Sequence, residues 1–572
     1  PPEPQEGIGF GTGAPGDFQL SQVEIDRLSG DFSAISIGSD NGSHVVTVGD
    51  PNNVVGSVVT VRDPLIILTP NNGGEIFQYG LLLGIDNASL QVIGSGHTYT
   101  LTGDITMAGN VDINDAVVID GSRTITSNTG NVTIGLPSGT VDGNSDGTPD
   151  DLVINATSGS VSIRGAVGGV GGNLLRNLTI NARAITFDGA VTLTGTLTLN
   201  GTTINIQGAV TVAGNIVVNP ATALTFYNTV TATGTITVSN TTSATFIGDV
   251  SATSMGITTT NLIDFTGSLT TTGGNAVLTT TAVTGQVKSR QGVAGAGTLT
   301  VNTGKSILMQ GVVSANSISL TAPAATGTIQ FDDTVTVNSG GSLTVVNAKN
   351  VTFRAAVAVA NAIVITATNS ILFQSSITTT TGGMALHAGA VGDISVSGVV
   401  TLGGLLSVDN ARNITFIAAV TATGSPDAVN LTAGTSISFN NKLTATSGNV
   451  VLNAGATGTI DVARELLISS GSLTLTNVFN ATFDAVTVPN GTITQTDGTG
   501  STRFDGAVSA KDSVNLRTQT LIDFNSNLAV SGTGNITLVA DEIDLDGGSG
   551  SVTGAGTITL QPRTAGASID IG

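Results

Sequence analysis

The segment VDGNSDGTPDDL, residues 141–152, carries oxygen-bearing side chains at the spacing of a calcium-binding loop. Gly147 stands at the sixth position, where an EF-hand-like loop turns sharply. The twelfth position is Val153 in place of the usual bidentate glutamate, although Asp151 could substitute for it, so we predict modest calcium affinity and a structural role. The predicted ligands, at positions 1, 3, 5, 7 and 9 of the loop, are Asp142, Asn144, Asp146, Thr148 (through its carbonyl) and Asp150.

A second acidic segment, DEIDLDGGSG at residues 541–550, places Asp544 and Asp546 on one face of an expected strand. It is similar to the aspartate-bearing calcium repeats of some β-helices, but it lacks their repetition. We therefore interpret it as a solvated turn.

Paired carboxylates raise the question of glycoside hydrolysis, which needs two carboxyl groups about 5–10 Å apart beside a sugar-sized cleft. Such clefts normally carry aromatic platforms and basic residues. This chain has no Trp and only three Tyr, so we predict that it is not an enzyme. Its three histidines are isolated in the sequence and are expected at the surface rather than as catalytic bases. The candidate groups are the pairs Asp332–Asp333 and Glu542–Asp544 and the histidines His44, His97 and His387.

The composition indicates the elements that must position these residues. Of 572 residues 76 are Gly, and Val, Thr and Ile, which favour strands, are abundant, as is Asn, which like Gly favours turns. The net charge is −21 without a basic cluster, which excludes nucleic acid and anionic membrane surfaces as partners but suits divalent cations. There is no Cys, and no apolar run reaches the roughly 18 residues of a membrane helix, so no membrane insertion is predicted.

Apolar residues return to one position every 19–24 residues, and 12 of the 17 Phe residues lie there. Because Ile, Val and Met alternate with Phe in this column, we expect it to fill a core rather than to stack on sugars. The column consists of Ile163, Phe187, Ile206, Phe226, Phe246, Phe265, Val287, Met309, Phe331, Phe353, Phe373, Val396, Phe416, Phe439, Val462, Phe483, Phe504 and Phe524.

A second apolar position follows four residues after the first, broken only by Gln291 and Thr487. Glycines such as those of Asp188-Gly189 and Asp505-Gly506 lie between the two positions, where we expect corners with positive φ. The second column consists of Val167, Val191, Val210, Val230, Val250, Leu269, Val313, Val335, Val357, Ile377, Val400, Val420, Leu443, Leu466, Val508 and Leu528.

These periods predict an all-β fold, a right-handed parallel β-solenoid (β-helix) with coils of about 20 residues and three short strands each. Equivalent side chains then lie one coil apart, about 4.8 Å, so the Phe column becomes a stacked interior ladder. We expect 22–25 coils, a rod on the order of 110 Å long.

The organisation along the chain is expected to have four parts. Residues 1–31 form a Pro/Gly-rich linker with a short helix near 20–28, where Ser21 and Glu24 can make a capping box. Less regular coils span 32–160, including the loop at 141–152, and regular coils span 161–530. Coils at 531–572 end in SIDIG without a polar cap, so we expect an interior length of something longer, able to dock another copy head to tail.

The opening GIGFGTGAPGDFQLSQVEIDRLSGDFSAISIGSDNGSHVVTV, followed by the repeats, resembles the filamentous-haemagglutinin-like family of large repetitive bacterial surface exoproteins. The resemblance covers essentially the whole chain and is one of repeat style. It implies a β-helix that is secreted, at the cell surface or extracellular. The Asn-Pro secretion motifs of the two-partner-secreted members have no clear counterpart here.

The sequence thus predicts an extracellular structural protein that assembles end to end into a filament, sheath, matrix or surface-layer fibre. Its expected partners are other copies of itself and calcium, with cell-surface polysaccharide as a further candidate. An adhesin stalk or passenger domain is the alternative, and a carbohydrate-active β-helix is a second, less favoured one.

Overall fold

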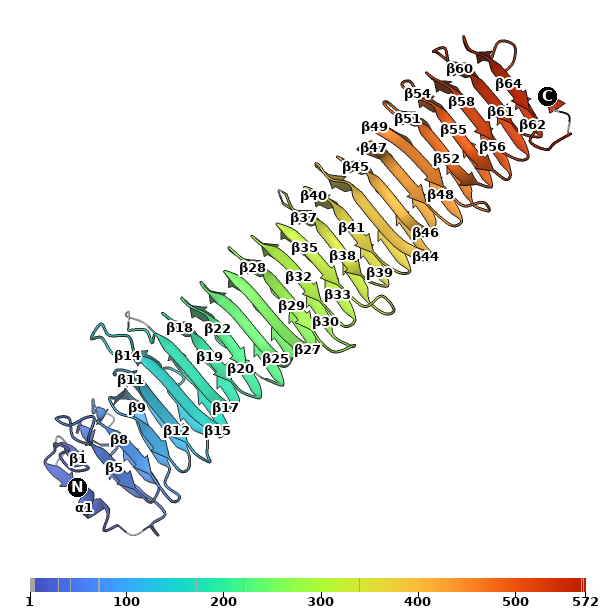
Figure 1. Cartoon of the computed structure of the whole chain (residues 1–572). Helices are drawn as coiled ribbons and strands as arrows, with labels where there is room; N and C mark the ends of the chain where they lie inside the picture. The colour runs from blue at the N-terminus through green and yellow to red at the C-terminus, as the bar shows by residue number, and fades with distance from the viewer. Residues whose placement is uncertain are drawn as a thin grey trace. The chain divides into compact units, whose positions relative to one another are not determined.

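The computed structural model describes residues 6–28, 30–41, 43–69, 73–169, 173–219, 221–338, 340–566, 568, 570 and 571. The chain forms two compact units, unit 1 at residues 1–281 and unit 2 at residues 282–572. Each unit is a stack of β coils, coloured blue to green for unit 1 and green to red for unit 2 in Figure 1. Together they hold about 24 turns of parallel β-solenoid with coils of about 21 residues, so the predicted all-β solenoid is confirmed.

One coil of unit 1 illustrates the repeat. It consists of β18 (Val191–Leu193), β19 (Leu197–Asn200) and β20 (Thr203–Ile206), in which buried and partly exposed residues alternate. This alternation is the period of a strand with one face on the core. Each strand pairs in parallel with its equivalent in the next coil: β21 (Val210–Val212), β22 (Ile216–Asn219) and β23 (Ala223–Phe226).

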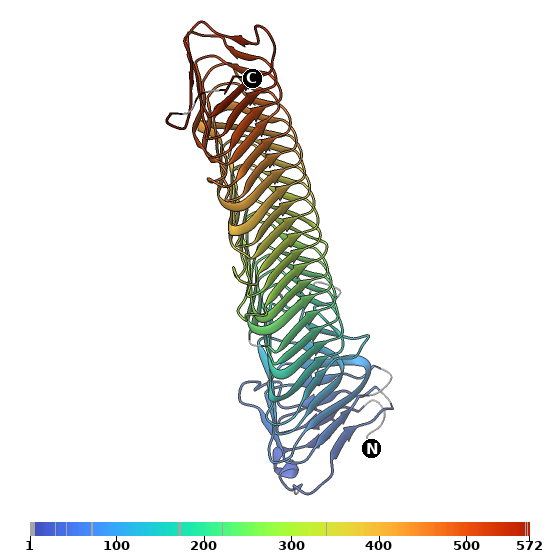
Figure 2. The same cartoon turned by 90° about the vertical axis from the view of Figure 1, so that its right-hand side faces the viewer.

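In several coils two of the three strands run together into one long strand around a corner. The long strands in unit 1 include β15 (Asp151–Ile163), β17 (Asn177–Phe187), β25 (Thr235–Phe246) and β27 (Ser254–Phe265). Those in unit 2 are β44 (Met384–Val396), β46 (Leu406–Phe416), β47 (Val420–Thr432) and β49 (Leu443–Asn453). Figure 2 shows the coils of each unit stacked in this way.

The helix expected near residues 20–28 is α1 (Gln22–Ile25), a single turn. Ser21 donates from its backbone N and from Oγ to Glu24 Oε2, both at 2.8 Å. The helix begins directly after the predicted cap Ser21 and ends at Ile25, before the expected end at residue 28. The preceding residues form β2 (Phe18–Leu20), which pairs with β1 (Ile8–Phe10). The boundaries at residues 31, 160 and 530 stay predictions. Residues 1–5 and 29 of the predicted linker, and residues 567, 569 and 572 of the final coils, lie outside the described residues.

The phenylalanine column faces inward and stacks. Every Phe assigned to it is at most 1% exposed. Where two Phe residues occupy neighbouring coils, their ring centroids lie 4.7–5.4 Å apart with interplanar angles of 4–16°. This offset stacking adds stabilisation to the burial of the rings themselves. The interior Phe ladder is confirmed.

The assignment of Val287 to this column was wrong. In the structure Ser289 pairs with Met309, while Val287 pairs with Ile307, two residues before the column. Ser289 is 1% exposed, and its Oγ donates to the carbonyl of Gly292 at 3.3 Å. Because this hydrogen bond satisfies the buried hydroxyl, the core accepts a polar residue that a search for apolar residues passes over.

The prediction that Gln291 and Thr487 interrupt the second column was also wrong. Val293, which is buried, pairs with Val313, so exposed Gln291 is not in the column. Leu466 pairs with Val486 and not with Thr487, because the corner after Phe483 is one residue shorter than the others. Both positions are therefore filled by valine.

Glycine is required at these corners for a different physical reason than the positive φ that we expected. Gly189, Gly248, Gly267 and Gly506 do not have positive φ. A Cβ at each of them would instead lie 2.4–2.8 Å from an atom of the preceding coil. Close approach between successive corners, not a left-handed backbone, requires glycine there.

Polar side chains also form ladders from coil to coil. In unit 1, Asn181 Nδ2 donates to Asn155 Oδ1 at 2.7 Å, and Asn200 and Asn219 continue the chain of amides, each at 2.6 Å. In unit 2, Asp393 on β44 accepts hydrogen bonds on Oδ1 from Arg412 Nε at 3.0 Å and Asn413 Nδ2 at 2.9 Å. The Arg412 hydrogen bond holds the pKa of the Asp393 carboxyl below its usual value.

Replacing Asp393 with asparagine should lower the stability of unit 2 at pH 7 by about 0.5 kcal/mol, a value small because the pair is half exposed. Since the folded pKa is lowered, the contribution is present above the unfolded value of about 3.9 and is lost as the pH falls through the folded pKa. Urea unfolding should therefore separate D393N from the unsubstituted chain at pH 7 and not at pH 2. The exposed Asp512 provides the control: D512N should match the unsubstituted chain at both pH values. An equal gap at both pH values would contradict the charge-based explanation.

Candidate metal centre

The predicted calcium loop lies in unit 1 between β14 (Thr140–Gly143) and β15. Gly147 has φ +83°, as the sharp turn requires. Asp146 Oδ1 accepts from the backbone N and Oγ1 of Thr148 at 2.7 and 2.6 Å, and these bonds lower the pKa of Asp146. Asn144 Oδ1 accepts from Asp146 N at 3.2 Å, and its Nδ2 donates to Asp120.

Asp150 closes this loop from within the fold. Its side chain is buried, with Oδ1 accepting from Gly121 N at 2.7 Å and Oδ2 from Asn144 N at 2.8 Å. Burial raises the pKa of Asp150, and the two backbone hydrogen bonds partly offset the rise. Asp142, on β14, accepts a hydrogen bond from Gly169 N. Asp151, the possible substitute ligand, pairs instead with Arg176.

These carboxylates accept hydrogen bonds from the loop itself and from neighbouring segments rather than converging on one point. Among the described residues, only one group of three acidic or metal-binding side chains brings its ligand atoms within 4.8 Å of one another, and it does not contain Asp142, Asp146 or Asp150. An oxygen that accepts a backbone hydrogen bond keeps a second lone pair for a cation, so these bonds do not prevent calcium binding, but the carboxylates would have to move closer to one centre. Calcium binding here stays a prediction.

Calorimetric titration of the full chain with calcium tests whether the loop at 141–152 binds the ion. If the loop binds calcium, Asp146→Ala should remove one binding equivalent of modest affinity, because Asp146 is a central ligand. Asp188→Ala, at an exposed aspartate of the same unit, is the matched control and should leave the stoichiometry unchanged. Unchanged stoichiometry in D146A would identify the loop as a spacer.

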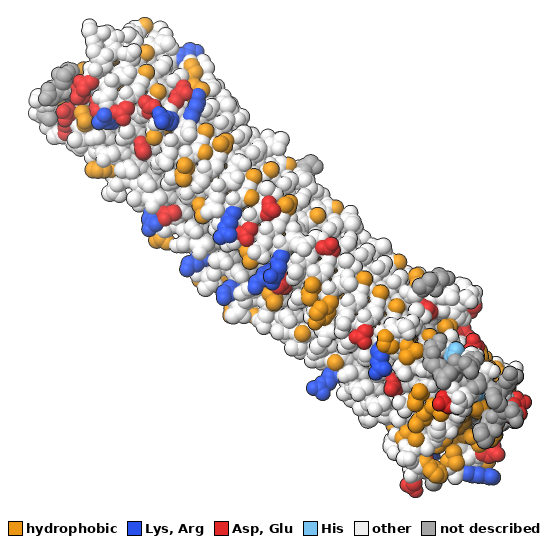
Figure 3. Space-filling model, turned by 180° about the vertical axis from the view of Figure 1, so that it is seen from behind, with side chains coloured by type: hydrophobic (Ala, Val, Ile, Leu, Met, Phe, Trp, Pro, Cys, Tyr) orange, Lys and Arg blue, Asp and Glu red, His pale blue; other side chains and the backbone are white. Residues whose placement is uncertain are grey.

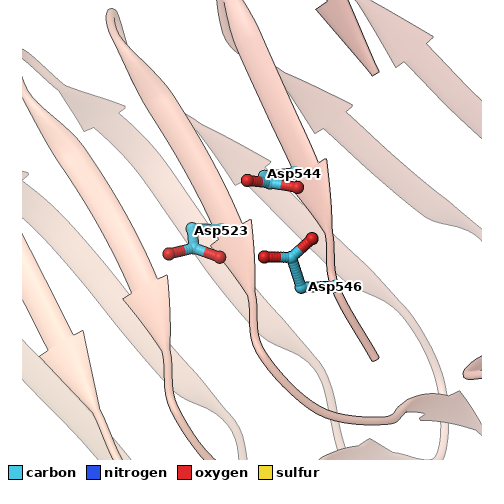
Figure 4. A group of neighbouring side chains, drawn as sticks. All are labelled: Asp523, Asp544 and Asp546. Carbon is cyan, nitrogen blue, oxygen red and sulfur yellow. The ribbon is translucent and has the colours of Figure 1, made fainter. Parts of the chain in front are cut away.

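The group that does converge lies in unit 2 and consists of Asp523, Asp544 and Asp546. Asp523 is on β59 (Leu521–Phe524), and Asp544 is on β62 (Glu542–Leu545) in the neighbouring coil. The two are direct partners in the parallel register, and Asp546 follows the end of β62. Figure 4 shows the three carboxylates turned toward a common space.

Asp523 is the most enclosed of the three, at 7% exposure. Its Oδ2 lies 3.7 Å from Arg503 Nε, on β56 (Ser501–Phe504) in the preceding coil. Its Oδ1 is buried without a hydrogen-bond partner. Figure 4 shows one Asp523 oxygen on the side of Asp546 and the other pointing away. Because Oδ2 is the oxygen near Arg503 in the preceding coil, we assign Oδ1 to the side of β62 and the cluster.

The electrostatics at Asp523 are unfavourable for a bare carboxylate. Burial raises its pKa most, Arg503 opposes the rise, and the negative charges of Asp544, Asp546 and Asp505 add to it. Arg503 compensates the negative charge of Asp523 only in part, because its Nε also donates to Asp505 Oδ1 at 2.6 Å.

The sequence pattern pointed to Asp544 and Asp546 but missed Asp523. The available signal was the alignment of LIDF at 521–524 with EIDL at 542–545, one coil apart, which places Asp523 beside Asp544. Within the segment 541–550, which we expected to be a solvated turn, Asp546 is exposed in a turn, whereas Asp544 is half-buried in β62.

The first pair of carboxylates considered for hydrolysis, Asp332 and Asp333, is held in structural contacts. Asp332 Oδ1 accepts from Arg354 Nη1 at 2.9 Å and Gln330 Nε2 at 2.7 Å, and Asp333 Oδ1 accepts from Thr334 N at 2.6 Å. Of the other pair, Asp544 belongs to the cluster described above.

The expectation that all three histidines lie at the surface was wrong for His44, which is 3% exposed. Its Nε2 accepts from Ser39 N at 3.3 Å, and burial lowers its pKa while a hydrogen bond with the backbone of Leu68 partly opposes this, so the ring has a structural role within the fold. His387 Nδ1 lies 2.8 Å from Asp409 Oδ1, and His97 Nε2 accepts from Gly73 N at 3.1 Å.

Over the part of the chain that the structure describes, no helix has the length and apolarity needed to cross a membrane. Comparison with family models, with curated proteins and with solved structures gave no match for this chain.

Proposed function

We propose that this chain is an extracellular structural protein, a β-solenoid scaffold of the filamentous-haemagglutinin-like kind that assembles end to end into a filament, sheath or matrix. The observation that supports it most is the uniformity of the coils. The same Phe, Val and Asn positions recur from coil to coil, in stacked ladders. The repeated coils of such a fold form an extended, repetitive surface rather than one site at which functional side chains meet.

The same geometry supports end-to-end assembly. The coil-to-coil pairings within each unit are parallel, with the backbone hydrogen bonds running along the stack. A parallel ladder is extended by any further coil with the same register, including one from a second copy. Because that contact is heterologous, repetition gives an open filament.

Electron microscopy of the full chain across a concentration series, with and without calcium, tests the proposal. Filaments with a regular axial repeat are expected. Dispersed single particles at the highest concentration under both conditions would overturn end-to-end assembly.

Polysaccharides incubated with the same material should stay intact, and cleavage that is lost in Asp332→Asn would overturn the non-enzymatic assignment.

An adhesin stalk or passenger domain is the second candidate, and exposed apolar side chains in the first coils of unit 1 favour it. Phe18, Phe32 and Val55 are 46%, 49% and 102% exposed. Figure 3 shows hydrophobic side chains gathered on this part of unit 1, and a contiguous exposed apolar patch commonly marks a contact surface. Single particles that bind a cell-surface polysaccharide, with binding weakened by Phe32→Ser, would favour this function over the filament.

A further inference from the structure

We propose that Asp523, Asp544 and Asp546 form a divalent-cation site of the calcium type, which joins two neighbouring coils of unit 2. The site is intramolecular and does not depend on the function proposed above. Its basis is the geometry of one carboxylate from β59, one from β62 and one from the turn after β62.

The separation of the oxygens suits calcium. The ligand atoms all lie within 4.8 Å of one another. Calcium binds oxygen at 2.3–2.6 Å, so oxygens on opposite sides of the ion can be about 4.6–5.2 Å apart. Magnesium demands a near-ideal octahedron and gives up its water ligands reluctantly, so three side chains held by two strands and a turn suit calcium better. Three carboxylates without His or Cys also select a hard cation over zinc.

The buried oxygen of Asp523 is the second observation that points to a ligand. Asp523 is 7% exposed, and its Oδ1, the oxygen not near Arg503, has no hydrogen-bond partner. A buried polar atom without a partner is costly, and native proteins nearly always satisfy it. A cation between the three carboxylates would satisfy it and would leave the outer side, at exposed Asp546, open for water ligands.

Charge gives a third reason. Figure 3 shows a surface that is largely uncharged, with acidic and basic side chains lying among one another near the C-terminal coils of unit 2. The nearby Arg503 forms ion pairs with two aspartates: its Nε lies 2.6 Å from Asp505 Oδ1 and 3.7 Å from Asp523 Oδ2. A divalent cation would neutralise the remaining repulsion, whereas the alternative is a proton shared between carboxylates.

Hydrogen exchange of the full chain, read by mass spectrometry with calcium and with EDTA, tests the site. Calcium is expected to slow exchange about tenfold or more in β59 and β62, because the ion ties the two strands together. Asp523→Asn and Asp544→Asn should each abolish this local protection and remove one calcium equivalent in calorimetry. Because D523N takes a charge out of the cluster, it should fold as well as the unsubstituted chain in EDTA.

The control is Asp264→Asn, which changes a buried aspartate in an identical LIDF sequence, residues 262–265 of unit 1. It should keep the calcium protection of β59 and β62. The loop at 141–152 lies in unit 1, so any binding there is read separately on β14 and β15.

Three results would overturn the proposal. One is calcium protection of β59 and β62 that survives in D523N and D544N. Another is protection that appears on lowering the pH in EDTA while calcium gives none, which would show a shared proton. The last is equal protection by magnesium at the same concentration, which would overturn the assignment to calcium.

Discussion

Replacing Phe353 with alanine is expected to destabilise unit 2 by about 3–5 kcal/mol, the usual cost of a large buried cavity. Phe353 is 1% exposed, and its ring stacks between Phe331 at 5.0 Å and Phe373 at 4.7 Å. The coils cannot close around the cavity, because the backbone ladders of β39 (Asn350–Phe353) with β36 (Thr328–Phe331) and β42 (Ser370–Phe373) fix their spacing.

The effect should stay close to the substituted coil, because each coil of a solenoid contacts only its neighbours. Hydrogen exchange should therefore accelerate in β36, β39 and β42 and stay unchanged in β56. Phe479→Ala, at a phenylalanine 43% exposed on the same unit, is the matched control and should cost much less. Phe353→Met should recover most of the stability, since Met309 already occupies an equivalent position. Equal losses for F353A and F479A would refute the interior ladder as a source of stability.

The register of the Phe column could be predicted from the sequence because Phe recurs at the same position of each repeat. Stacked coils explain this recurrence, since they place equivalent side chains in contact. The prediction failed at Ser289, where a local hydrogen bond satisfies a buried hydroxyl. It failed again at Val486, where the corner is one residue shorter. Neither a satisfied polar group in the core nor the length of a corner is encoded in hydrophobicity.

The candidate sites were harder to predict for a related reason. The spacing from Asp142 to Asp150 shows which oxygens could reach an ion, but not that Asp150 accepts hydrogen bonds from Gly121 and Asn144. The Asp523 cluster depends on the register between two coils, which a motif within one coil does not contain. A site assembled across coils becomes visible in the sequence only after the coils have been aligned.

Replacing Gly208 with alanine is expected to destabilise unit 1 by about 1–3 kcal/mol, the cost of overpacking, although alanine adds only a methyl group. Gly208 lies at the corner between β20 and β21. A Cβ there would lie 2.1 Å from the carbonyl oxygen of Gly189 and 2.3 Å from its carbonyl carbon. Both are backbone atoms, so no side chain can move aside. The corner would have to open, which would strain the neighbouring ladder bond from Gln207 N to Phe187 O, now 2.9 Å.

The control for this substitution is Gly256→Ala, at a glycine in β27 where an added methyl group would meet no atom within 4 Å and where φ is not positive. Both substitutions remove the same backbone freedom from the unfolded chain, which alone stabilises a protein by about 0.4–1 kcal/mol. That contribution cancels in the comparison, so the difference between G208A and G256A measures the close approach of successive corners. Urea unfolding should place G208A below the unsubstituted chain and G256A at or above it. If the two variants unfolded at the same urea concentration, the corner glycines would owe their place to something other than contact with the preceding coil.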